Sequence, residues 1–484
     1  MGKKYLSFSD VARQNGLNSG SSSRPVICVQ GLGFVGIAMA VAVANARDSA
    51  GNYCFNVIGV DLPTKEGTGR IKSINRGVLP FDTTDEKMKE AFSRSFKDGV
   101  FLAVSDPDVF SLASVTLVSI NLDLQCGPDN PQVDATGFKK AMATLGSRMP
   151  ADSLIIVETT VPPGTCEKVV VPEVQAALKA RGMPSDSILV AHSYERVMPG
   201  DHYLDSIINF WRVYAGNTEE AADRCRDFLS KVINVGDFPL TRLSSMTASE
   251  TGKILENSYR AVNIAFMEEW GRFAEEANID LFEIISAIRK RPTHSNIRQP
   301  GFGVGGYCLT KDPLFIKVST RDLFGREDLE FPFCEMAVRT NNKMPLVSLE
   351  YVRRHFNGNL SGRTILLMGV SYRQDVGDTR YSPSQIFAEK AIAEGAKIIA
   401  SDPMLDYWQE MEMKVQRNIP GLNGVDAVVF AVPHREYLEL DLRRWLEGRS
   451  PFIFDANNVI STKTLQELKR ENYSVQAIGR GGIG

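Results

Sequence analysis

Histidine and cysteine are both scarce in this sequence. The five histidines, at positions 192, 202, 294, 355 and 434, are scattered, and their spacing does not indicate zinc, which argues against a zinc alcohol dehydrogenase. The seven cysteines form an odd set without close pairs. That pattern fits a reducing compartment better than a disulfide framework, so we expect a cytoplasmic protein without a bound metal.

Long apolar runs and a strong charge imbalance are missing as well. The net charge is −3 and no long basic run is present, which argues against a nucleic-acid partner. No apolar segment reaches the roughly 18 residues that a membrane-spanning helix needs, so we expect no membrane partner. Residues 1–24 are polar, with serines at 21, 22 and 23, and lack the apolar core of a secretory signal. We expect them to be a flexible tail.

A glycine-rich turn near the start of the chain is its first positive feature. Val26–Gln30 reads as a buried strand, Gly31-Leu32-Gly33-Phe34-Val35-Gly36 follows at once, and residues 37–44 read as a helix of small residues. Strand, Gly-x-Gly-x-x-Gly and helix together are typical of a dinucleotide site, where the helix N-terminus faces the pyrophosphate. A tight turn without a ligand is the alternative. The expected cofactor contacts here are Gly31, Gly33, Phe34, Val35 and Gly36.

Asp61 follows the second expected strand, Asn56–Val60. It lies 25 residues after Gly36, somewhat farther than the usual gap of about 20. A carboxylate at this place binds the ribose hydroxyls and repels a 2′-phosphate. The sequence therefore favours NAD over NADP.

Alternation of strands and helices continues beyond Asp61. Apolar runs at 114–121, 153–159 and 188–192 predict buried parallel strands. Ligands in such sheets gather at the carboxyl ends of strands. We therefore expect a cleft at the residues that end these strands, namely Gly31, Asp61, Asn121, Thr160 and Glu195.

The middle of the chain has a different period. Residues 244–277 run without proline and with helical patterning, much longer than the mean helix of about 11–12 residues. We expect this helix to span the molecule and form a subunit interface; a plain core helix is the alternative. A second α/β unit begins at 364–370, with further strands at 397–401, 427–431 and 452–455, and it lacks Gly-x-Gly-x-x-Gly.

The expected fold is therefore α/β, with two Rossmann-like α/β domains joined by a long central helix. Its 484 residues, 43% of them hydrophobic and 23% charged, suit two or three soluble domains. The expected division is a flexible tail (1–24), an NAD-binding domain (25–240), a central helical domain that carries the cysteine loop (241–345) and a second α/β domain that binds the substrate (346–484).

Cys308 ends a second glycine-rich segment, in which Gly301, Gly303, Gly305 and Gly306 precede the thiol. Glycines let a backbone approach a bound ligand closely. Lys311 and Asp312 follow within a turn, and nearby charge tunes how much of a cysteine is the reactive thiolate. A structural cysteine is the alternative.

These motifs, taken in order, resemble those of the UDP-glucose/GDP-mannose dehydrogenases, NAD-dependent enzymes that oxidise C6 of a nucleotide sugar to a carboxylate. The resemblance covers roughly residues 25–482. It rests on Gly31–Gly36, Val118-Ser119-Ile120-Asn121, Glu158-Thr159-Thr160-Val161-Pro162-Pro163-Gly164-Thr165, Tyr194-Glu195-Arg196-Val197-Met198-Pro199-Gly200, Lys253 and Asn257 with Arg260, the Cys308 segment and Gly377-Asp378-Thr379-Arg380.

The resemblance implies a role for each matching residue. Cys308 matches the nucleophile, and Asp312 with Thr160 matches the pair that positions water. Lys253 and Asn257 match the pair that stabilises an oxyanion, although a solvated helix face is the alternative for two such residues. Glu195 matches the carboxylate implicated in thioester hydrolysis. Further implied cofactor contacts are Ser119, Asn121, Thr159, Lys311 and Arg380, and implied substrate contacts are Arg196, Arg260, Phe302, Gly303, Gly305, Tyr372 and Arg373.

The expected chemistry is a four-electron oxidation. An aldehyde formed at C6 gives up a second hydride only after a nucleophile has added to it, so a thiolate at Cys308 would form a thiohemiacetal and then a thioester that water hydrolyses. The resemblance also implies a homodimer and a place in polysaccharide biosynthesis.

Departures from the family pattern bear on the substrate. Leu122-Asp123 replaces Thr-Pro, Arg373 replaces a lysine, and Asp455-Ala456-Asn457-Asn458 lacks an arginine found in UDP-glucose members. Pro199 takes the place of a second glutamate, and Glu195-Arg196-Val197 is similar to the branch that oxidises UDP-N-acetylhexosamines. We expect a UDP-N-acetylhexosamine 6-dehydrogenase. UDP-glucose as substrate, a two-electron dehydrogenase and a non-catalytic sugar-nucleotide sensor stay open. The number of NADH released per sugar separates these classes: two for a four-electron enzyme, one for a two-electron enzyme and none for a sensor.

Overall fold

The computed structural model describes residues 5, 7–21, 23–125, 127–185, 188–198 and 200–481. The chain divides into two compact units. We call Met1–Leu255 with Phe315–Glu330 the N-terminal unit, and Glu256–Leu314 with Phe331–Gly484 the C-terminal unit. Each is described by itself.

The N-terminal unit is built on a doubly wound sheet. Its strands lie in the order β10-β9-β8-β7-β4-β1-β2-β3, and β8 pairs antiparallel with β9 whereas the other pairs are parallel. The order reverses between β1 and β4, which is where ligands bind in such sheets. The strands are β1 (Val26–Gln30), β2 (Asn56–Val60), β3 (Phe101–Val104), β4 (Ala113–Val118), β7 (Leu154–Val157), β8 (Leu189–His192), β9 (Val213–Gly216) and β10 (Thr241–Arg242).

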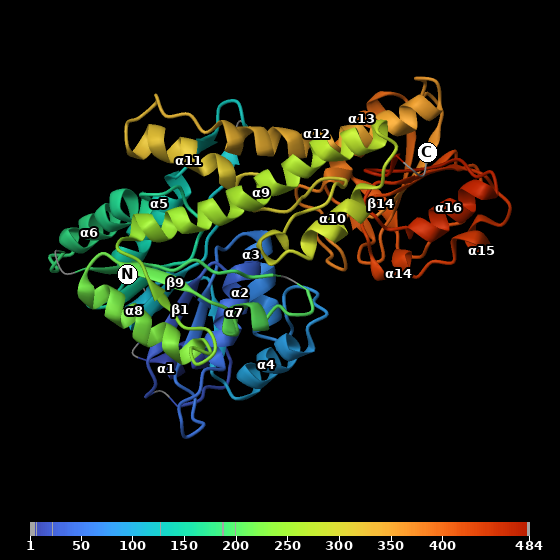
Figure 1. Cartoon of the computed structure of the whole chain (residues 1–484). Coiled ribbons are helices and arrows are strands. Elements are labelled where there is room, and N and C mark those ends of the chain that lie inside the picture. The colour runs from blue at the N-terminus through green and yellow to red at the C-terminus, as the bar shows by residue number, and fades with distance from the viewer. Residues whose placement is uncertain are drawn as a thin grey trace. The chain divides into compact units, whose positions relative to one another are not determined.

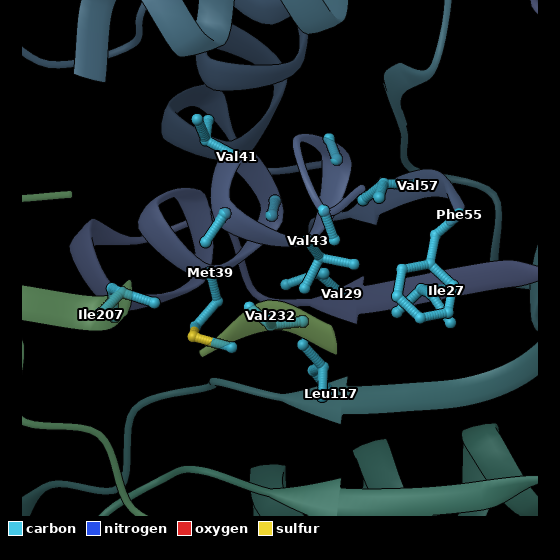
Figure 2. Close-up of a cluster of buried hydrophobic side chains, with 14 of the residues drawn as sticks. Ile27, Val29, Met39, Val41, Val43, Phe55, Val57, Leu117, Ile207 and Val232 are labelled. Carbon is cyan, nitrogen blue, oxygen red and sulfur yellow. The ribbon is translucent and has the colours of Figure 1, made fainter. Parts of the chain in front are cut away.

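Helices cover both faces of this sheet because alternate strand residues point to opposite sides. Ile27 and Val29 of β1 pack with Met39 and Val43 of helix α2 (Phe34–Ala44), which follows β1 in the chain, as Figure 2 shows. Cys28 lies in the cluster on the opposite face. The helices of the first face include α2, α4 (Glu86–Lys97) and α8 (Glu219–Val232), and those of the second include α5 (Thr136–Gly146) and α6 (Val171–Ala180). The unit also contains α3 (Lys65–Ile74), α7 (Asp205–Ile208), α11 (Phe315–Val318) and the hairpin β5 (Leu124–Gln125) and β6 (Gln132–Val133).

The expectation of a flexible tail is wrong for part of the N-terminus. Phe8–Gln14 forms helix α1, whose N-cap Ser7 accepts the N–H of Asp10 at 3.2 Å. Phe8, Val11 and Ala12 are buried in the same cluster as Cys28. Their i, i+3, i+4 spacing gives a short apolar helix face, which the polar composition of the surrounding residues concealed.

The C-terminal unit repeats the doubly wound plan. Its strand order is β13-β14-β12-β11-β15-β16-β17, with β13 and β14 antiparallel and the other pairs parallel, and it reverses between β11 and β15. The strands are β11 (Thr364–Met368), β12 (Lys397–Ser401), β13 (Tyr407–Trp408), β14 (Met413–Gln416), β15 (Ala427–Phe430), β16 (Phe452–Asp455) and β17 (Val475–Ala477).

Two apolar layers enclose this second sheet. Ile365 and Leu367 face α12 (Pro332–His355) and α13 (Pro383–Ala393). Leu366 and Met368 pack in the other cluster. That cluster includes residues of α14 (Arg435–Leu438), α15 (Leu442–Leu446) and α16 (Thr462–Arg470). The α/β class expected from the sequence is confirmed.

The long central helix is confirmed too. α9 runs from Met246 to Glu276, 31 residues, as one continuous helix (Figure 1), and α10 (Leu281–Arg289) follows it. Residues up to Leu255 count with the N-terminal unit and those from Glu256 with the C-terminal unit. Across the part of the chain that the structure describes, no helix combines the length and apolar character needed to cross a bilayer.

Candidate active site

The glycine-rich turn of the N-terminal unit fits a dinucleotide. Gly31 has φ +90°, and a Cβ there would lie 2.6 Å from the carbonyl oxygen of Ser119; a Cβ at Gly36 would lie 1.8 Å from that of Gly31. The backbone of the turn itself therefore requires glycine at both positions. At Gly33, by contrast, a Cβ would meet nothing within 4 Å, and this N-cap residue of α2 has no side chain to cap the helix. The open side of Gly33 and the uncapped helix N-terminus suit a pyrophosphate.

The Asp61 carboxylate forms an ion pair with Arg70, a residue that the sequence analysis did not identify. Its Oδ2 accepts from Nε of Arg70 at 2.8 Å, and its Oδ1 accepts from the N–H of Leu62 at 2.8 Å. The carboxylate is 8% exposed and Arg70 28%. The Asp61 carboxylate, expected from the sequence to bind the ribose, is therefore fixed in place with an arginine beside it.

A buried ion pair lies behind the ends of β4 and β7. Glu158 Oε1 accepts from Arg212 at 2.6 Å, Glu158 Oε2 accepts from Ser119 Oγ at 3.2 Å, and both charged side chains are buried. Burial raises the pKa of Glu158 to about 7, although Arg212 acts to lower it. Glu158 lies in one of the motifs that resemble the family, but no role was expected for it. Arg212 was not identified from the sequence, because no local pattern marks two residues that pair across 54 positions.

The expected residues at these strand ends differ in exposure. Thr159 Oγ1 donates to the carbonyls of Val118 at 3.1 Å and Ile120 at 2.9 Å, so this side chain fixes the turn. Thr160 beside it is half-buried, and Asn121 is exposed. Ser119 and Thr159 thus both make hydrogen bonds at the ends of β4 and β7.

Glu195 and Lys253 come together in the N-terminal unit. Lys253 Nζ donates to the carbonyl oxygen of Glu195 at 2.8 Å and lies 3.4 Å from its Oε1, and both residues are buried. Glu195 Oε2 also accepts from the N–H of Val197. The ammonium lies 5.6 Å from the centre of the Tyr194 ring. A lysine and a carboxylate, 58 positions apart in sequence, thus form one polar group.

Arg196 is engaged with aromatic neighbours of its own unit. Its guanidinium donates to the Tyr194 hydroxyl at 3.3 Å and to the carbonyl of Trp211, and it lies 5.7 Å from the Phe210 ring centre. Pro199, whose identity bore on the substrate, lies outside the described residues.

Histidine takes no acid–base role at the ends of this sheet. His192 closes β8, is fully buried, and its Nδ1 lies 2.8 Å from Ser249 Oγ. Burial lowers its pKa to about 3, so the ring is neutral at neutral pH. Among the described side chains, no group of three or more His, Cys, Asp or Glu could hold a metal ion.

Cys308 sits on an exposed turn of the C-terminal unit above a buried polar group. The carbonyl of Cys308 accepts the N–H of Asp312 at 2.9 Å, and the thiol side is open to solvent. The Asp312 carboxylate is 1% exposed and accepts from Asn257 Nδ2 at 2.7 Å and Lys311 Nζ at 3.1 Å. Asn257, Lys311 and Asp312 are therefore brought together. Lys311, expected as a cofactor contact, pairs with Asp312 and lies 4.3 Å from the Tyr307 ring centre.

The glycines before Cys308 lie close to neighbouring protein atoms. A Cβ at Gly305 would lie 2.5 Å from the carbonyl oxygen of Tyr381, and one at Gly306 would lie 2.8 Å from the Tyr372 ring. Gly303 has φ +105°, which favours glycine. The Tyr372 side chain therefore packs directly on the cysteine turn. Phe302 is 1% exposed and packs on Phe387, so its side chain belongs to the core and not to a ligand surface.

Arg260 of the C-terminal unit interacts electrostatically with two further arginines and with Cys308. Burial lowers the pKa of Arg260, and the charges of Arg298 and Arg373 lower it further, whereas Cys308 acts in the opposite direction. Arg298 was missed by the sequence analysis. Three guanidinium groups of this kind suit a diphosphate. Arg380 is paired with Asp378 at 2.6 Å and remains partly exposed.

Comparison with known proteins assigns the chain. Domain profiles of the UDP-glucose/GDP-mannose dehydrogenase family match it over residues 25–233 (NAD binding domain), 247–343 (central domain) and 366–462 (UDP binding domain). The chain belongs to this family. It is an NAD-dependent nucleotide-sugar dehydrogenase, and its dinucleotide turn and Asp61 are the residues that fit the cofactor.

Relatives of this dehydrogenase match most of its length. UDP-N-acetyl-D-mannosamine dehydrogenase of Methanocaldococcus jannaschii is 28% identical over 94% of this chain and 96% of its own, and that of Campylobacter jejuni is 27% identical over 86% and 96%. The solved UDP-D-ManNAc dehydrogenase of Pyrococcus horikoshii superimposes with a TM-score of 0.78 at 24% identity, over 94% of this chain and all of that one. A UDP-glucose dehydrogenase of Pyrobaculum islandicum superimposes with a TM-score of 0.77 at 21% identity, over 96% and 98%. The fold is thus common to members named for different sugars.

Proposed function

We propose that this dehydrogenase oxidises the C6 hydroxyl of a UDP-N-acetylhexosamine to the carboxylate, through a thiohemiacetal and a thioester on Cys308. The observation that carries the proposal is an exposed thiol on a turn whose backbone is tied to the buried Asp312. A two-electron dehydrogenase or a sensor has no use for that arrangement.

Cys308 supplies the covalent step. The C6 alcohol is first oxidised to an aldehyde, with loss of a hydride and a proton. The thiolate then adds to the aldehyde carbon, forming a C–S bond, and the alkoxide takes up a proton. The loss of a second hydride and a proton gives the thioester, and water breaks the C–S bond to leave the acid and the thiol. When bound, NAD would supply the hydride acceptor, one molecule for each oxidation step.

Polar side chains handle the developing charges. One N–H of the Asn257 side-chain amide donates to Asp312, and the second N–H can donate to an oxyanion. The Lys253 ammonium, which lies one helical turn from Asn257 along α9, is the second expected donor. In the C-terminal unit, Asp312 is the acid proposed to position water. In the N-terminal unit, Thr160 is a proposed water-positioning residue and Glu195 assists hydrolysis of the thioester. The cations Arg260, Arg298 and Arg373, with Tyr372, hold the UDP moiety.

The choice of sugar rests on sequence similarity. The relatives named above as UDP-N-acetyl-D-mannosamine dehydrogenases and the Glu195-Arg196-Val197 segment support an N-acetylated hexose. The test is NADH release from UDP-Glc, UDP-GlcNAc, UDP-GalNAc, UDP-ManNAc and GDP-Man. We expect two NADH per sugar with a UDP-N-acetylhexosamine. Turnover of UDP-Glc alone would shift the assignment to a UDP-glucose 6-dehydrogenase.

The covalent step has its own test. Cys308→Ala should form no acid, because the second oxidation requires the sulfur adduct. Asp312→Asn should slow water attack and let the thioester accumulate, visible as added mass on the intact protein. A Cys308→Ala enzyme that still released two NADH per sugar would overturn the mechanism, and Cys334→Ala serves as the matched control for loss of a thiol.

The assembly that we propose is a homodimer joined through α9. Tyr259, Phe266, Trp270 and Phe273 on this helix are exposed, and the last three rings contact one another in sequence, at 6.2 and 5.9 Å between centroids. Such a run of aromatic side chains on a helix face is typical of a protein interface.

A further inference from the structure

A buried Asp–His pair lies at the switch point of the C-terminal sheet. Asp402 follows β12 and His434 follows β15, while the segment 369–375 follows β11. The strand order reverses between β11 and β15. In doubly wound sheets ligands bind beside the carboxyl ends of the strands at this point. Asp402 and His434 are nevertheless both 0% exposed, so neither can touch a ligand itself.

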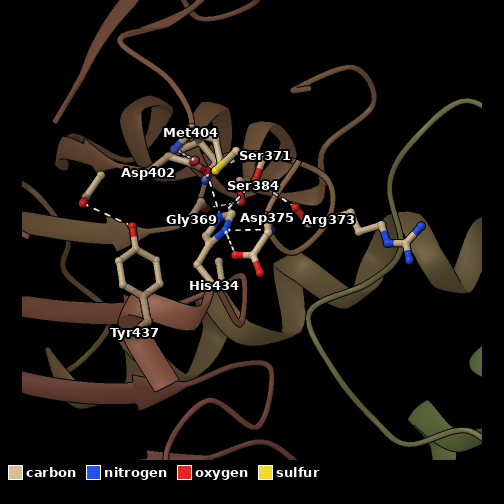
Figure 3. A network of polar contacts seen from close by, with 12 residues as sticks. Gly369, Ser371, Arg373, Asp375, Ser384, Asp402, Met404, His434 and Tyr437 are labelled. Atoms are coloured by element: carbon tan, nitrogen blue, oxygen red, sulfur yellow. Dashed lines mark hydrogen bonds and ion pairs between the residues drawn. The ribbon is translucent and has the colours of Figure 1, made fainter. Parts of the chain in front are cut away.

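Asp402 grips the start of the segment. Its Oδ2 accepts the N–H of Val370 at 2.9 Å, the N–H of Ser371 at 2.8 Å and His434 Nε2 at 3.1 Å, as Figure 3 shows. Its Oδ1 accepts the N–H of Met404 at 3.0 Å. A buried carboxylate with this many donors is fully satisfied and fixes the backbone groups that it contacts.

His434 grips the end of the segment. Its Nδ1 accepts the N–H of Asp375 at 3.0 Å, and its Nε2 lies 3.1 Å from Asp402 Oδ2 and 3.0 Å from Ser371 Oγ. Between the two ends, Ser371 Oγ donates to the carbonyl oxygen of Arg373 at 3.2 Å. The pair thus holds the segment 370–375 at both ends by its backbone.

This segment carries Tyr372 and Arg373, two of the side chains proposed above to hold the UDP moiety. Tyr372 packs on Gly305 and Gly306 of the turn that ends in Cys308. Arg373 belongs to the group of cations that act on Arg260. Displacement of the segment would therefore move a tyrosine and a guanidinium that the sugar nucleotide needs.

We propose that Asp402 and His434 are positioning residues, which act through the backbone of 370–375 to place Tyr372 and Arg373 against the UDP-sugar. The inference rests on the proposed function for the role of those two side chains. It adds a pair that no motif marked, because the two residues lie 32 positions apart and are hidden from the ligand.

The test compares His434→Ala with a control that removes a hydrogen bond next to it. His434→Ala leaves the N–H of Asp375 without its acceptor, so the segment loses one of its two anchors. Tyr437→Phe keeps the ring that lies 5.4 Å from the imidazole and removes only the contact of its hydroxyl with Ser401 at 3.2 Å. Both variants are measured well below their melting temperatures, so that both stay folded and a general loss of stability does not change the measured binding.

The readouts are UDP binding by calorimetry and steady-state kinetics. We expect His434→Ala to weaken UDP binding and raise KM for the UDP-sugar by about tenfold or more, with kcat and KM for NAD within about a factor of two of the wild type. Tyr437→Phe should match the wild type. UDP affinity unchanged in His434→Ala, or lowered equally in Tyr437→Phe, would overturn the proposal.

Two conservative variants keep the test decisive if His434→Ala fails to fold. His434→Asn retains an acceptor near Nδ1, which faces Asp375, whereas His434→Gln retains a donor near Nε2, which faces Asp402. UDP should bind more tightly to the Asn variant than to the Gln variant, and equal or reversed affinities would contradict the role of Asp375. A wild type that binds UDP yet oxidises no UDP-sugar would sink the proposed function and leave this inference intact.

Discussion

Glu158 and Arg212 place two opposite charges where almost no water reaches. The Nε and Nη1 atoms of Arg212 have no hydrogen-bond partner among the described residues, so the pair depends on the single contact at 2.6 Å. Removing one partner of a buried pair typically costs 3–5 kcal/mol, because the other charge is left unpaired. This pair therefore stabilises the ends of β4 and β7 only while both partners are present.

Arg212→Met should destabilise the protein by roughly 3–5 kcal/mol, and more at pH 8 than at pH 6. The pKa of Glu158 is raised to about 7 in the folded chain from an ordinary 4.5, so the folded state holds the proton longer and stability falls as pH rises through that window. Loss of Arg212 removes an effect that lowers this pKa, which extends the window upward. Urea unfolding at both pH values checks the trend. In the double variant Glu158→Gln/Arg212→Met the added pH dependence should vanish, and its persistence would assign the effect to another group.

Arg70 makes a separate prediction about the cofactor. Asp61→Ala removes the carboxylate that repels a 2′-phosphate and releases the Arg70 guanidinium, a good phosphate ligand. We expect kcat/KM with NADP to rise relative to NAD by about tenfold or more. Asp61→Ala/Arg70→Ala should lose most of that gain. If the double variant used NADP as well as the single one, Arg70 would have no part in the selectivity.

At the scale of elements, strands were more predictable than pairings. The apolar runs at 26–30, 56–60, 397–401 and 452–455 became strands with those bounds, because buried parallel strands carry near-continuous apolar residues. β9 and β17 were not foreseen, since Val213–Gly216 and Val475–Ala477 are too short to show a period. α1 was hidden among polar residues.

The candidate site divides in the same way. Residues within one motif, such as Gly31 to Gly36 or Cys308 with Asp312, could be predicted because their spacing alone sets their geometry. Arg70, Arg212 and Arg298 could not, because each acquires its partner through the fold. The contacts of Gly305 and Gly306 with Tyr381 and Tyr372 could not be predicted either, because those tyrosines lie more than 60 positions further along the chain.

α9 carries the prediction about assembly. Phe273 is 57% exposed and stacks edge-on against Trp270, in an apolar face that a partner would cover. Phe266→Asp/Phe273→Asp should convert the dimer to a monomer in light scattering at micromolar concentration. Tyr407→Asp, which replaces an exposed ring elsewhere in the C-terminal unit, should leave the dimer unchanged. A wild type that is monomeric and fully active would rule out the dimer as a requirement.

At the scale of the whole molecule, two compact units divide the work of binding. The dinucleotide turn belongs to the N-terminal unit, and the Tyr372–Arg373 segment belongs to the C-terminal unit. We expect hydrogen exchange to slow at residues 31–36 when NAD is added and at 369–375 when UDP is added, because each ligand stabilises the backbone that it orders. UDP protection restricted to the N-terminal unit would contradict the division.

Because Cys308 is exposed, an electrophilic reagent can label this protein at that position. Cys28, Cys166 and Cys225 are buried, and burial raises the pKa of each thiol, so these cysteines react slowly with electrophiles. Cys308 is open to solvent on its turn. An alkyne-tagged haloacetamide should therefore label position 308 ahead of these three. Such a tag would report, in a crude extract, what fraction of the enzyme still has an unmodified Cys308. A UDP-sugar fragment carrying the same reactive group would be a starting point for a covalent inhibitor.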